Sequence, residues 1–300
     1  QELREQTSLP KERVFQTKIE LFWQMLQRAQ AEGIPFDAVA CDGLYGRSFE
    51  LRQKMDLADI EFYADIPANI QVYLSEPKIG IPQNKRGPKA TNPSVLSPQP
   101  YRVENLRGHS SVLWHTLTIR PTERGWLTAD FARISVWTVQ DDMTVTKQWL
   151  LMRKEGKKHS YTFSNASFDT SLKVMALRKS QRYFIERDNQ DAKSEFGWDE
   201  IETTSFRAWE HQLAFTVLAQ WFITQTRLDW EDEYQRDPNL LSQYEVTLLP
   251  ALSVANVREL LRAALPLPTL SPLKAASLVV QHLDNRTRSR KSRLLNRSGP

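Results

Sequence analysis

The feature that most constrains the fold is a short apolar run at residues 36–41, FDAVAC, which stops abruptly at Asp42, Gly43 and Gly46. Predominantly apolar runs of this length are typical of strands that are buried on both faces of an α/β sheet. Open α/β sheets place their working residues at the carboxyl ends of such strands. The run therefore predicts an α/β fold with Asp42 at a functional edge of the sheet.

The neighbouring segments continue the α/β pattern. Apolar residues recur at helical spacing over residues 17–31, and a second helix is predicted at residues 49–55 with Ser48 as its cap. A second strand is predicted at residues 61–66, and Pro67 ends it. Helices and strands thus alternate through the first part of the chain, as α/β folds require.

The rest of the chain changes character twice. Residues 76–101 hold six prolines and little periodicity, which predicts an exposed linker or a disordered loop. Alternating residues then predict an antiparallel β unit, with strands at residues 112–119, 128–139 and 147–153 and another beginning at Tyr161. Helices are predicted at residues 171–195, 206–228, 254–264 and 272–283. We expect the aromatic residues of the 206–228 helix, such as Trp209 and Trp221, to lie in the core.

Composition narrows the classes of protein. A chain of 300 residues with 40% hydrophobic content can fill one large core or two ordinary ones. No apolar run reaches the roughly 18 residues of a membrane span, and the lone Cys41 excludes an internal disulfide framework. The net charge of +4 favours an anionic partner. We expect a cytoplasmic protein, and a fragment of a longer one, because it opens on Gln1.

A second motif lies at residues 182–193, RYFIERDNQDAK. At 3.6 residues per turn, Arg182, Glu186 and Lys193 fall on nearly one face of a helix. A carboxylate flanked by two cations is either a solvated ladder of charges or part of a site that handles phosphate and metal. Hard divalent cations prefer oxygen ligands. Two such ions, about 3.5–4 Å apart, can drive phosphodiester exchange.

Both motifs resemble one family. VACDGLYG, which contains Asp42, resembles the segment around the second aspartate of DDE transposases of bacterial insertion sequences. The spacing of Arg182, Glu186 and Lys193 resembles the RxxxExxxxxxK signature that carries their final glutamate. In the insertion-sequence-four-like superfamily the signature begins with Tyr three positions before the Arg, where this chain has Lys179.

The resemblance implies an α/β fold: a partial ribonuclease H-like catalytic core, interrupted by a β-rich insertion and followed by C-terminal helices. The implied segments are the second half of the core at 1–75, a Pro-rich linker at 76–101, the β-rich insertion at 102–170, core helices carrying Glu186 at 171–230, and C-terminal helices with a basic tail at 231–300. The first aspartate of the family is expected outside this sequence, so the chain alone is expected to be inactive.

The resemblance also implies the site. Asp42 and Glu186 would hold two Mg²⁺ ions, with Mn²⁺ as the alternative, and the third carboxylate would come from outside the chain. The expected contacts with DNA phosphates are Arg182, Lys193, Lys85, Arg86 and Lys89. Without the resemblance, Asp42 before a glycine is more often a turn or cap residue, and Glu186 more often part of a solvated helix face.

The expected activity is metal-dependent phosphodiester cleavage and strand transfer at the ends of a mobile element. Double-stranded DNA, as element ends and as target, is the expected partner of a homodimer associated with the bacterial nucleoid. Two alternatives stay open. One is a transposase-derived DNA-binding protein that no longer cuts, and the other is a nuclease of the same fold that cuts without joining.

Overall fold

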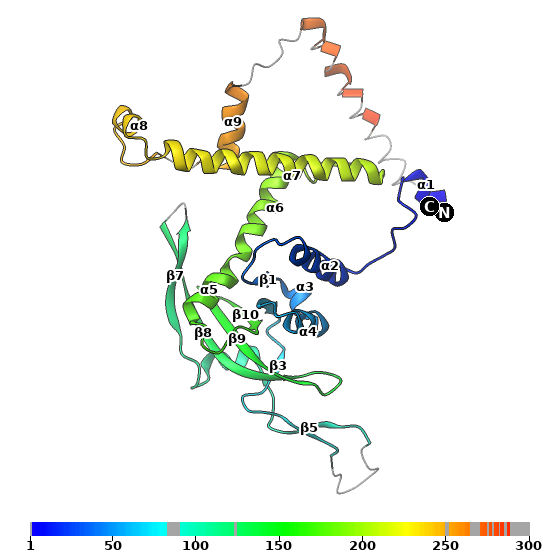
Figure 1. Cartoon of the computed structure of the whole chain (residues 1–300), viewed down its shortest axis with the longest axis vertical. Coiled ribbons are helices and arrows are strands. Elements are labelled where there is room, and N and C mark those ends of the chain that lie inside the picture. Colours follow the sequence, from blue (N-terminus) through cyan, green and yellow to red (C-terminus); the bar gives the residue numbers. More distant parts are fainter. Residues whose placement is uncertain are drawn as a thin grey trace. The chain divides into compact units, whose positions relative to one another are not determined.

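The computed structural model describes residues 2–82, 91–122, 125–249 and 252–264, together with shorter pieces of 271–288. The chain divides into two compact units, Gln1–Gln190 and Asp191–Pro300. Within the described part, no helix has the length and apolar character needed to cross a membrane. Figure 1 gives the order of the elements along the chain.

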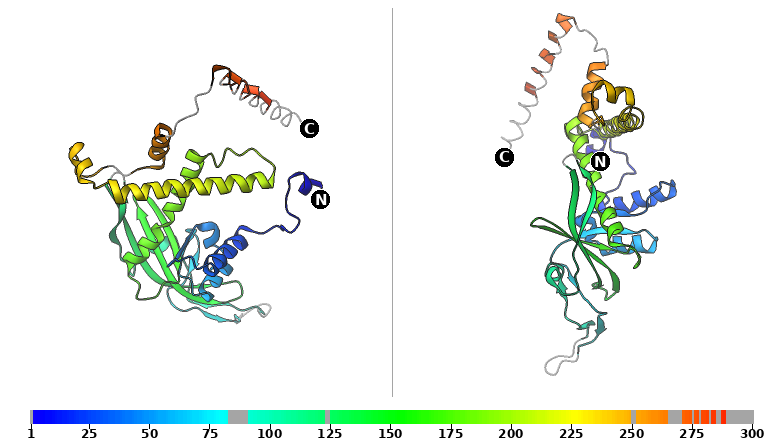
Figure 2. Two further views of the ribbon diagram at one scale, coloured as in Figure 1. Left: turned by 45° about the horizontal axis from the view of Figure 1, so that its top comes forward. Right: turned by 90° about the vertical axis from the view of Figure 1, so that its left-hand side faces the viewer.

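The first unit is built on a six-stranded sheet with the order β1-β2-β10-β9-β8-β7. Its strands are β1 (Val39–Cys41), β2 (Phe62–Ile66), β7 (His115–Thr122), β8 (Gly125–Val139), β9 (Val145–Glu155) and β10 (Lys158–Ser164). β1 and β2 run parallel, and the other neighbouring pairs of this sheet are antiparallel. The predicted antiparallel β unit is confirmed, and through β10 it continues the sheet that β1 and β2 begin. Figure 2 shows how strongly the long strands twist.

Helices cover both faces of this sheet. α2 (Lys18–Ala31) and α4 (Phe49–Leu57) pack on one face, and α5 (Leu172–Ser180) packs on the other. The side chains of β2 alternate between the two faces, because Phe62 and Ala64 join the first cluster while Tyr63 joins the second. This alternation places Asp65, like Tyr63, on the α5 side of the sheet.

The caps of the first helices follow the sequence. The Thr17 hydroxyl accepts the Glu20 N–H at the start of α2, and the Glu20 carboxylate accepts the Thr17 N–H in return. The predicted cap of α4 is confirmed, because the Ser48 hydroxyl accepts a hydrogen bond from the Leu51 N–H at 3.2 Å. A short helix, α3 (Gly43–Gly46), stands between β1 and α4.

The strand predicted at residues 36–41 is shorter and less buried than expected. β1 covers three residues, Phe36 is 37% exposed, and Val39 and Ala40 are only partly buried. The reason is position, since β1 is an edge strand of this sheet and β2 is its one neighbour among the described strands. The expectation of a strand buried on both faces is therefore wrong.

The described part of residues 76–101, predicted as an exposed linker or disordered loop, contains short strands: β4 (Lys78–Gly80) pairs with β5 (Ser94–Ser97). At the borders of this stretch, β3 (Gln71–Val72) pairs with β6 (Tyr101–Arg102). A 3₁₀ helix, Val103–Gly108, follows. Strands this short, separated by prolines, give no periodic signal in a sequence.

One helix predicted at residues 171–195 is in fact two. α5 ends at Ser180, and α6 (Arg182–Phe196) begins after Gln181. At the break the Gln181 N–H donates to Arg178 O and the Phe184 N–H donates to Gln181 O. Both bonds span three residues rather than four, so the chain tightens locally and the helical ladder is interrupted.

The second unit is helical in its described part. α7 (Phe206–Asp229), a π-helical turn at Trp230–Tyr234, α8 (Pro238–Gln243) and α9 (Val254–Ala264) follow α6, while α1 (Glu2–Gln6) belongs to the first unit. The helices expected at 206–228 and 254–264 are confirmed. The expectation that the aromatic stripe of α7 is core is wrong, because Trp209 and Trp221 are 38% and 64% exposed.

Candidate functional site

Two aspartates lie at neighbouring positions near the carboxyl ends of the two parallel strands, Asp42 just after β1 and Asp65 as the second-last residue of β2. Cys41 of β1 is in register with Ala64 of β2, and the next residue of each chain segment is Asp42 or Asp65. Burial raises the pKa of the Cys41 thiol to about 12, and the charges of Asp65 and Asp42 add to that shift. The carboxyl ends of parallel strands meet at one sheet edge. The structure therefore gathers two carboxylates where the sequence predicted one.

Asp42 is exposed and caps α3. Its Oδ1 accepts hydrogen bonds from the backbone N–H groups of Leu44, at 2.9 Å, and Tyr45, at 3.4 Å. Its Oδ2 accepts no hydrogen bond from the described residues. The cap is the ordinary role of an aspartate before a glycine. Because the cap engages one oxygen and leaves the other, Asp42 is held in place and still offers an oxygen ligand.

Gly46 fixes the spacing between the two strand ends. A Cβ atom at this position would lie 1.9 Å from the backbone oxygen of Asp65, so only glycine lets α3 pack directly on β2. The guanidinium of Arg52, which is buried in α4, donates a hydrogen bond to the Gly46 carbonyl. Burial lowers the pKa of Arg52 to about 10, which leaves it charged at neutral pH.

Asp65 is engaged far more heavily than Asp42. Its Oδ1 lies 2.9 Å from Lys179 Nζ and also accepts a hydrogen bond from the Thr162 hydroxyl, and its Oδ2 lies 3.5 Å from Arg182 Nε. Lys179 is buried, and burial lowers its pKa against the opposing effect of the Asp65 carboxylate. Asp65 is thus engaged by two cations and a hydroxyl, with the two shorter contacts on Oδ1 and the 3.5 Å ion pair on Oδ2.

Glu186 joins this network through Arg182. Its Oε1 lies 2.7 Å from Arg182 Nη1, one helical turn earlier in α6, so the predicted common face of these two residues is confirmed. Arg182 consequently bridges Asp65 and Glu186. No direct contact joins Glu186 to Asp42 among the residues that the structure describes.

The other residues predicted to bind DNA are Lys193, Lys85, Arg86 and Lys89. Lys193 is exposed on α6, in the part of the helix that belongs to the second unit. Lys85, Arg86 and Lys89 fall within residues 83–90, outside the described residues. Of the predicted phosphate contacts that the structure describes within the first unit, Arg182 lies beside Asp65 near the strand ends.

The donor set suits a hard cation in type but is incomplete. Carboxylate oxygens are the ligands that Mg²⁺ prefers, and Asp42 has one oxygen that is not engaged. The Glu186 carboxylate is ion-paired with Arg182, and Asp65 is ion-paired with Lys179 and Arg182. Across the described ranges, no group of three or more His, Cys, Asp or Glu residues is placed to hold a metal ion.

Two solvent-open hollows border the strand ends. One of about 310 Å³ is lined by Gly43, Arg47 and Asp65 among others. The other, of about 340 Å³, lies between β1 and the α5–α6 junction, where Arg178 and Arg182 line it. Guanidinium groups beside a carboxylate edge are well suited to orient a phosphate.

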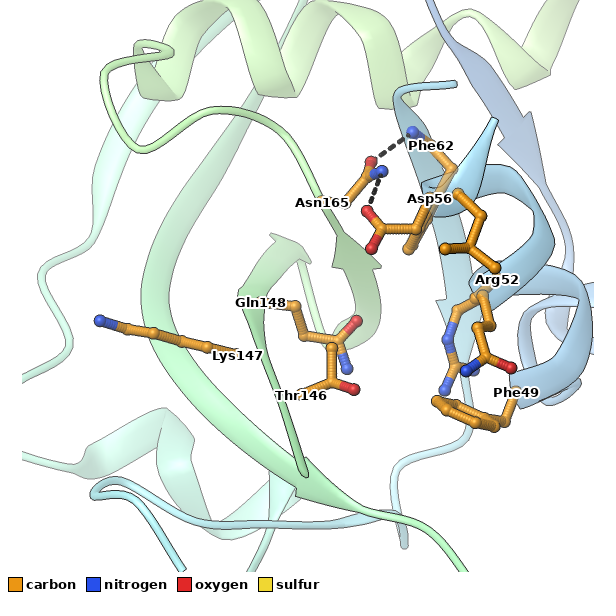
Figure 3. Close-up of a pocket in the computed structure, with 10 residues that line it drawn as sticks. Phe49, Arg52, Asp56, Phe62, Thr146, Lys147, Gln148 and Asn165 are labelled. Atoms are coloured by element: carbon orange, nitrogen blue, oxygen red, sulfur yellow. Dashed lines mark hydrogen bonds between the residues drawn. The ribbon is translucent and has the colours of Figure 1, made fainter. Parts of the chain in front are cut away.

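A third pocket lies at the start of β2, and neither Asp42 nor Asp65 lines it. It measures about 160 Å³ between α4 and β9, and Phe62, the first residue of β2, lines it. Figure 3 shows Asn165 at this pocket, where its side chain accepts the Phe62 N–H at 2.9 Å and donates to Asp56 at 2.8 Å. Through Asn165 these bonds connect the start of β2 to α4, so the polar side chains at this pocket hold the fold together.

The sequence held signals for the two residues that it did not nominate. Asp65 lies two residues before Pro67, near the end of a predicted strand, and Asp42 directly follows one. Lys179 stands where the signature of the resembled superfamily has Tyr, and the structure shows its role as the buried partner of Asp65. Pairing between these two positions could not be inferred from sequence, because 114 residues separate them.

Comparison with known families adds an independent finding. The family model described as DDE superfamily endonuclease matches residues 1–125. No curated protein matches the chain. The matched stretch contains Asp42 and Asp65 and ends before α5 and α6, so it does not cover Glu186.

These findings support a DDE-type nuclease domain in the first part of the chain, which implies DNA as substrate. The mixed α/β fold with C-terminal helices is consistent with a ribonuclease H-like domain of this type. Domains of this type generally depend on a divalent metal.

Proposed function

We propose that this chain is the catalytic part of a DDE transposase, which cuts phosphodiester bonds at the ends of a mobile element and joins the ends to target DNA. The observation that carries the proposal is the position of Asp42. It ends a parallel strand within the stretch that matches the endonuclease family, and one of its oxygens is unengaged. The R-x₃-E-x₆-K spacing in α6 supports transposition in particular.

Asp42 and Glu186 would hold the metal, Mg²⁺ or Mn²⁺, together with a third carboxylate. When bound, such ions activate the attacking oxygen and stabilise the leaving oxygen of a phosphodiester. As a metal ligand Glu186 would give up its contact with Arg182 Nη1, and that donor would then be available to a DNA phosphate while Arg182 Nε stays beside Asp65. Without the third carboxylate, the chain by itself would be inactive.

The cations expected to follow the DNA backbone are Lys193, Lys85, Arg86 and Lys89, as point charges that release counterions. Joining two element ends requires two active sites, so we propose a homodimer. Its place of action would be the bacterial nucleoid.

The test uses the protein encoded by the complete reading frame and duplex DNA that carries the element ends. Asp42→Asn and Glu186→Gln should each lower Mg²⁺-dependent cleavage by about 10³-fold or more, because each removes a charged oxygen ligand. Asp59→Asn is the matched control, since Asp59 is exposed just before β2, at the end of the strand away from the site. Cleavage that persists in Asp42→Asn would refute the site.

A second assay separates the two alternatives. A DNA with a pre-cut 3′ end should be joined to target DNA by the wild-type protein. Cleavage without joining would indicate a nuclease of the same fold, and tight DNA binding without either step would indicate a DNA-binding derivative.

A further inference from the structure

We infer that Asp65 is a positioning residue, which fastens the start of α6, and with it Glu186, to the sheet edge that carries Asp42. We call Asp65, Thr162, Lys179 and Arg182 the Asp65 clamp. The catalytic consequence rests on the proposed function, whereas the clamp itself rests on geometry alone.

The clamp joins three elements at one carboxylate. Thr162 lies directly opposite Asp65 on β10, Lys179 is in the last turn of α5, and Arg182 is the first residue of α6. All three side chains contact Asp65. The carboxylate therefore ties the sheet to the chain on both sides of the break at Gln181.

The burial of Lys179 makes this link strong. Its side chain is 8% exposed, and a buried ammonium group is costly unless a paired, hydrogen-bonded charge compensates it. Asp65 is that charge. The helix end that holds Lys179 is therefore fixed with respect to β2, not only packed against it.

The first half of α6 depends on such contacts because it buries little. The buried residues of α6 are Asp191 and Ala192, both beyond its midpoint. Near the start, Arg182 contacts Asp65, and the Arg120 guanidinium of β7 lies 3.8 Å from the centre of the Tyr183 ring. If the contact between Arg182 and Asp65 is lost, the first turn of α6 can move relative to α5 at the break at Gln181.

Arg182 carries the restraint onward to Glu186. Its Nε faces Asp65 while its Nη1 faces Glu186, so one rigid guanidinium plane connects the two carboxylates. Asp65 thus fixes the position of the Glu186 side chain before a metal binds. In this role Asp65 itself contacts neither metal nor DNA.

The chain offers a matched control for this pair. Glu61, next to the start of β2, forms an ion pair of 2.6 Å with Arg178 of α5 and accepts a hydrogen bond from the Tyr63 hydroxyl. Glu61→Gln therefore breaks an ion pair between the same two regions, but at the end of β2 that lies away from Asp42.

Hydrogen exchange of the full-length protein tests the clamp without reference to activity. Asp65→Asn and Lys179→Met should speed exchange in residues 182–190 by about tenfold or more, because the helix start opens locally. Glu61→Gln should leave that segment unchanged, and Lys179→Arg should restore most of the protection. Wild-type exchange in residues 182–190 of Asp65→Asn would overturn the clamp whether or not the protein cuts DNA.

Cleavage kinetics then test the positioning role. Asp65→Asn should raise the Mg²⁺ concentration for half-maximal cleavage about tenfold and lower kcat, with the KM for DNA unchanged. Glu61→Gln should keep the wild-type metal dependence. A loosened α6 with wild-type metal dependence would overturn the role in positioning. If the wild-type protein cuts no DNA, the proposed function fails, and hydrogen exchange still decides the clamp.

Discussion

An aspartate lies near the carboxyl end of β1 and another near that of β2, and the two differ in burial and in their partners. Asp42 is exposed and makes only backbone hydrogen bonds, whereas Asp65 is mostly buried and holds two cations and a hydroxyl. A carboxylate with an unengaged oxygen can take a ligand, and one that is paired with side chains from several elements can hold those elements together. The difference separates a candidate catalytic residue from a positioning residue within one sheet edge.

The largest expected difference between the two strand ends is in stability. Asp65→Ala strands the buried Lys179 and should lower the free energy of unfolding by about 3–5 kcal/mol, as measured by urea denaturation. The double variant Asp65→Leu with Lys179→Met should recover most of the loss, since an apolar pair can replace a buried ion pair. If Asp65→Ala lowered the free energy of unfolding by less than about 1 kcal/mol, the Asp65 clamp would contribute little to stability.

The end of β1 also carries a titratable group that β2 lacks at the paired position: Cys41, which precedes Asp42, lies opposite Ala64. Because its pKa is raised from 9.0 to about 12, alkylation at pH 8 should be about a thousandfold slower than for an ordinary thiol. The unfolded chain ionises above pH 9 while the folded thiol stays protonated, so this group should lower stability as pH rises past 9. Alkylation at the rate of a free thiol would mean that β1 opens readily.

The contact between the two strand ends gives a third test. Gly46→Ala places a methyl group into the Asp65 backbone and should cost about 1–3 kcal/mol in the free energy of unfolding. Gly43→Ala is the control, because its Cβ would meet Asp65 at an ordinary 3.8 Å. Equal losses in thermal or urea unfolding would contradict the close packing of α3 on β2.

The smallest expected effect is the loss of the cap at Asp42. Asp42→Ala should cost about 1 kcal/mol in unfolding free energy, like Ser48→Ala at the start of α4. A loss of the size expected for Asp65→Ala would mean that Asp42 has a structural role that the hydrogen bonds do not reveal.

Much of the fold could be predicted from local pattern. The helix at 17–31, the Ser48 cap, the strand before Pro67 and the antiparallel strands all rest on spacing and capping rules. The edge position of β1, the pairing of β4 with β5 and the exposure of Trp221 depend on tertiary neighbours, which spacing does not encode.

The candidate site divides in the same way. Asp42 was visible because an apolar run and a glycine mark it, and the face shared by Arg182 and Glu186 followed from helical geometry. Asp65 was hidden because its partners on α5 and α6 come more than a hundred residues later. Whether Lys193 binds DNA stays a prediction.

The central claim is that Asp42 and Glu186 act together as oxygen ligands of a DNA-cutting site, held by Asp65. The most direct measurement is Mg²⁺-dependent cleavage of element-end DNA by wild type, Asp42→Asn, Glu186→Gln, the double variant and Asp59→Asn. We predict losses of about 10³-fold or more in each single variant, no further loss in the double variant, and wild-type rates for Asp59→Asn. Single variants that retain cleavage, or losses that multiply in the double variant, would contradict a shared metal site.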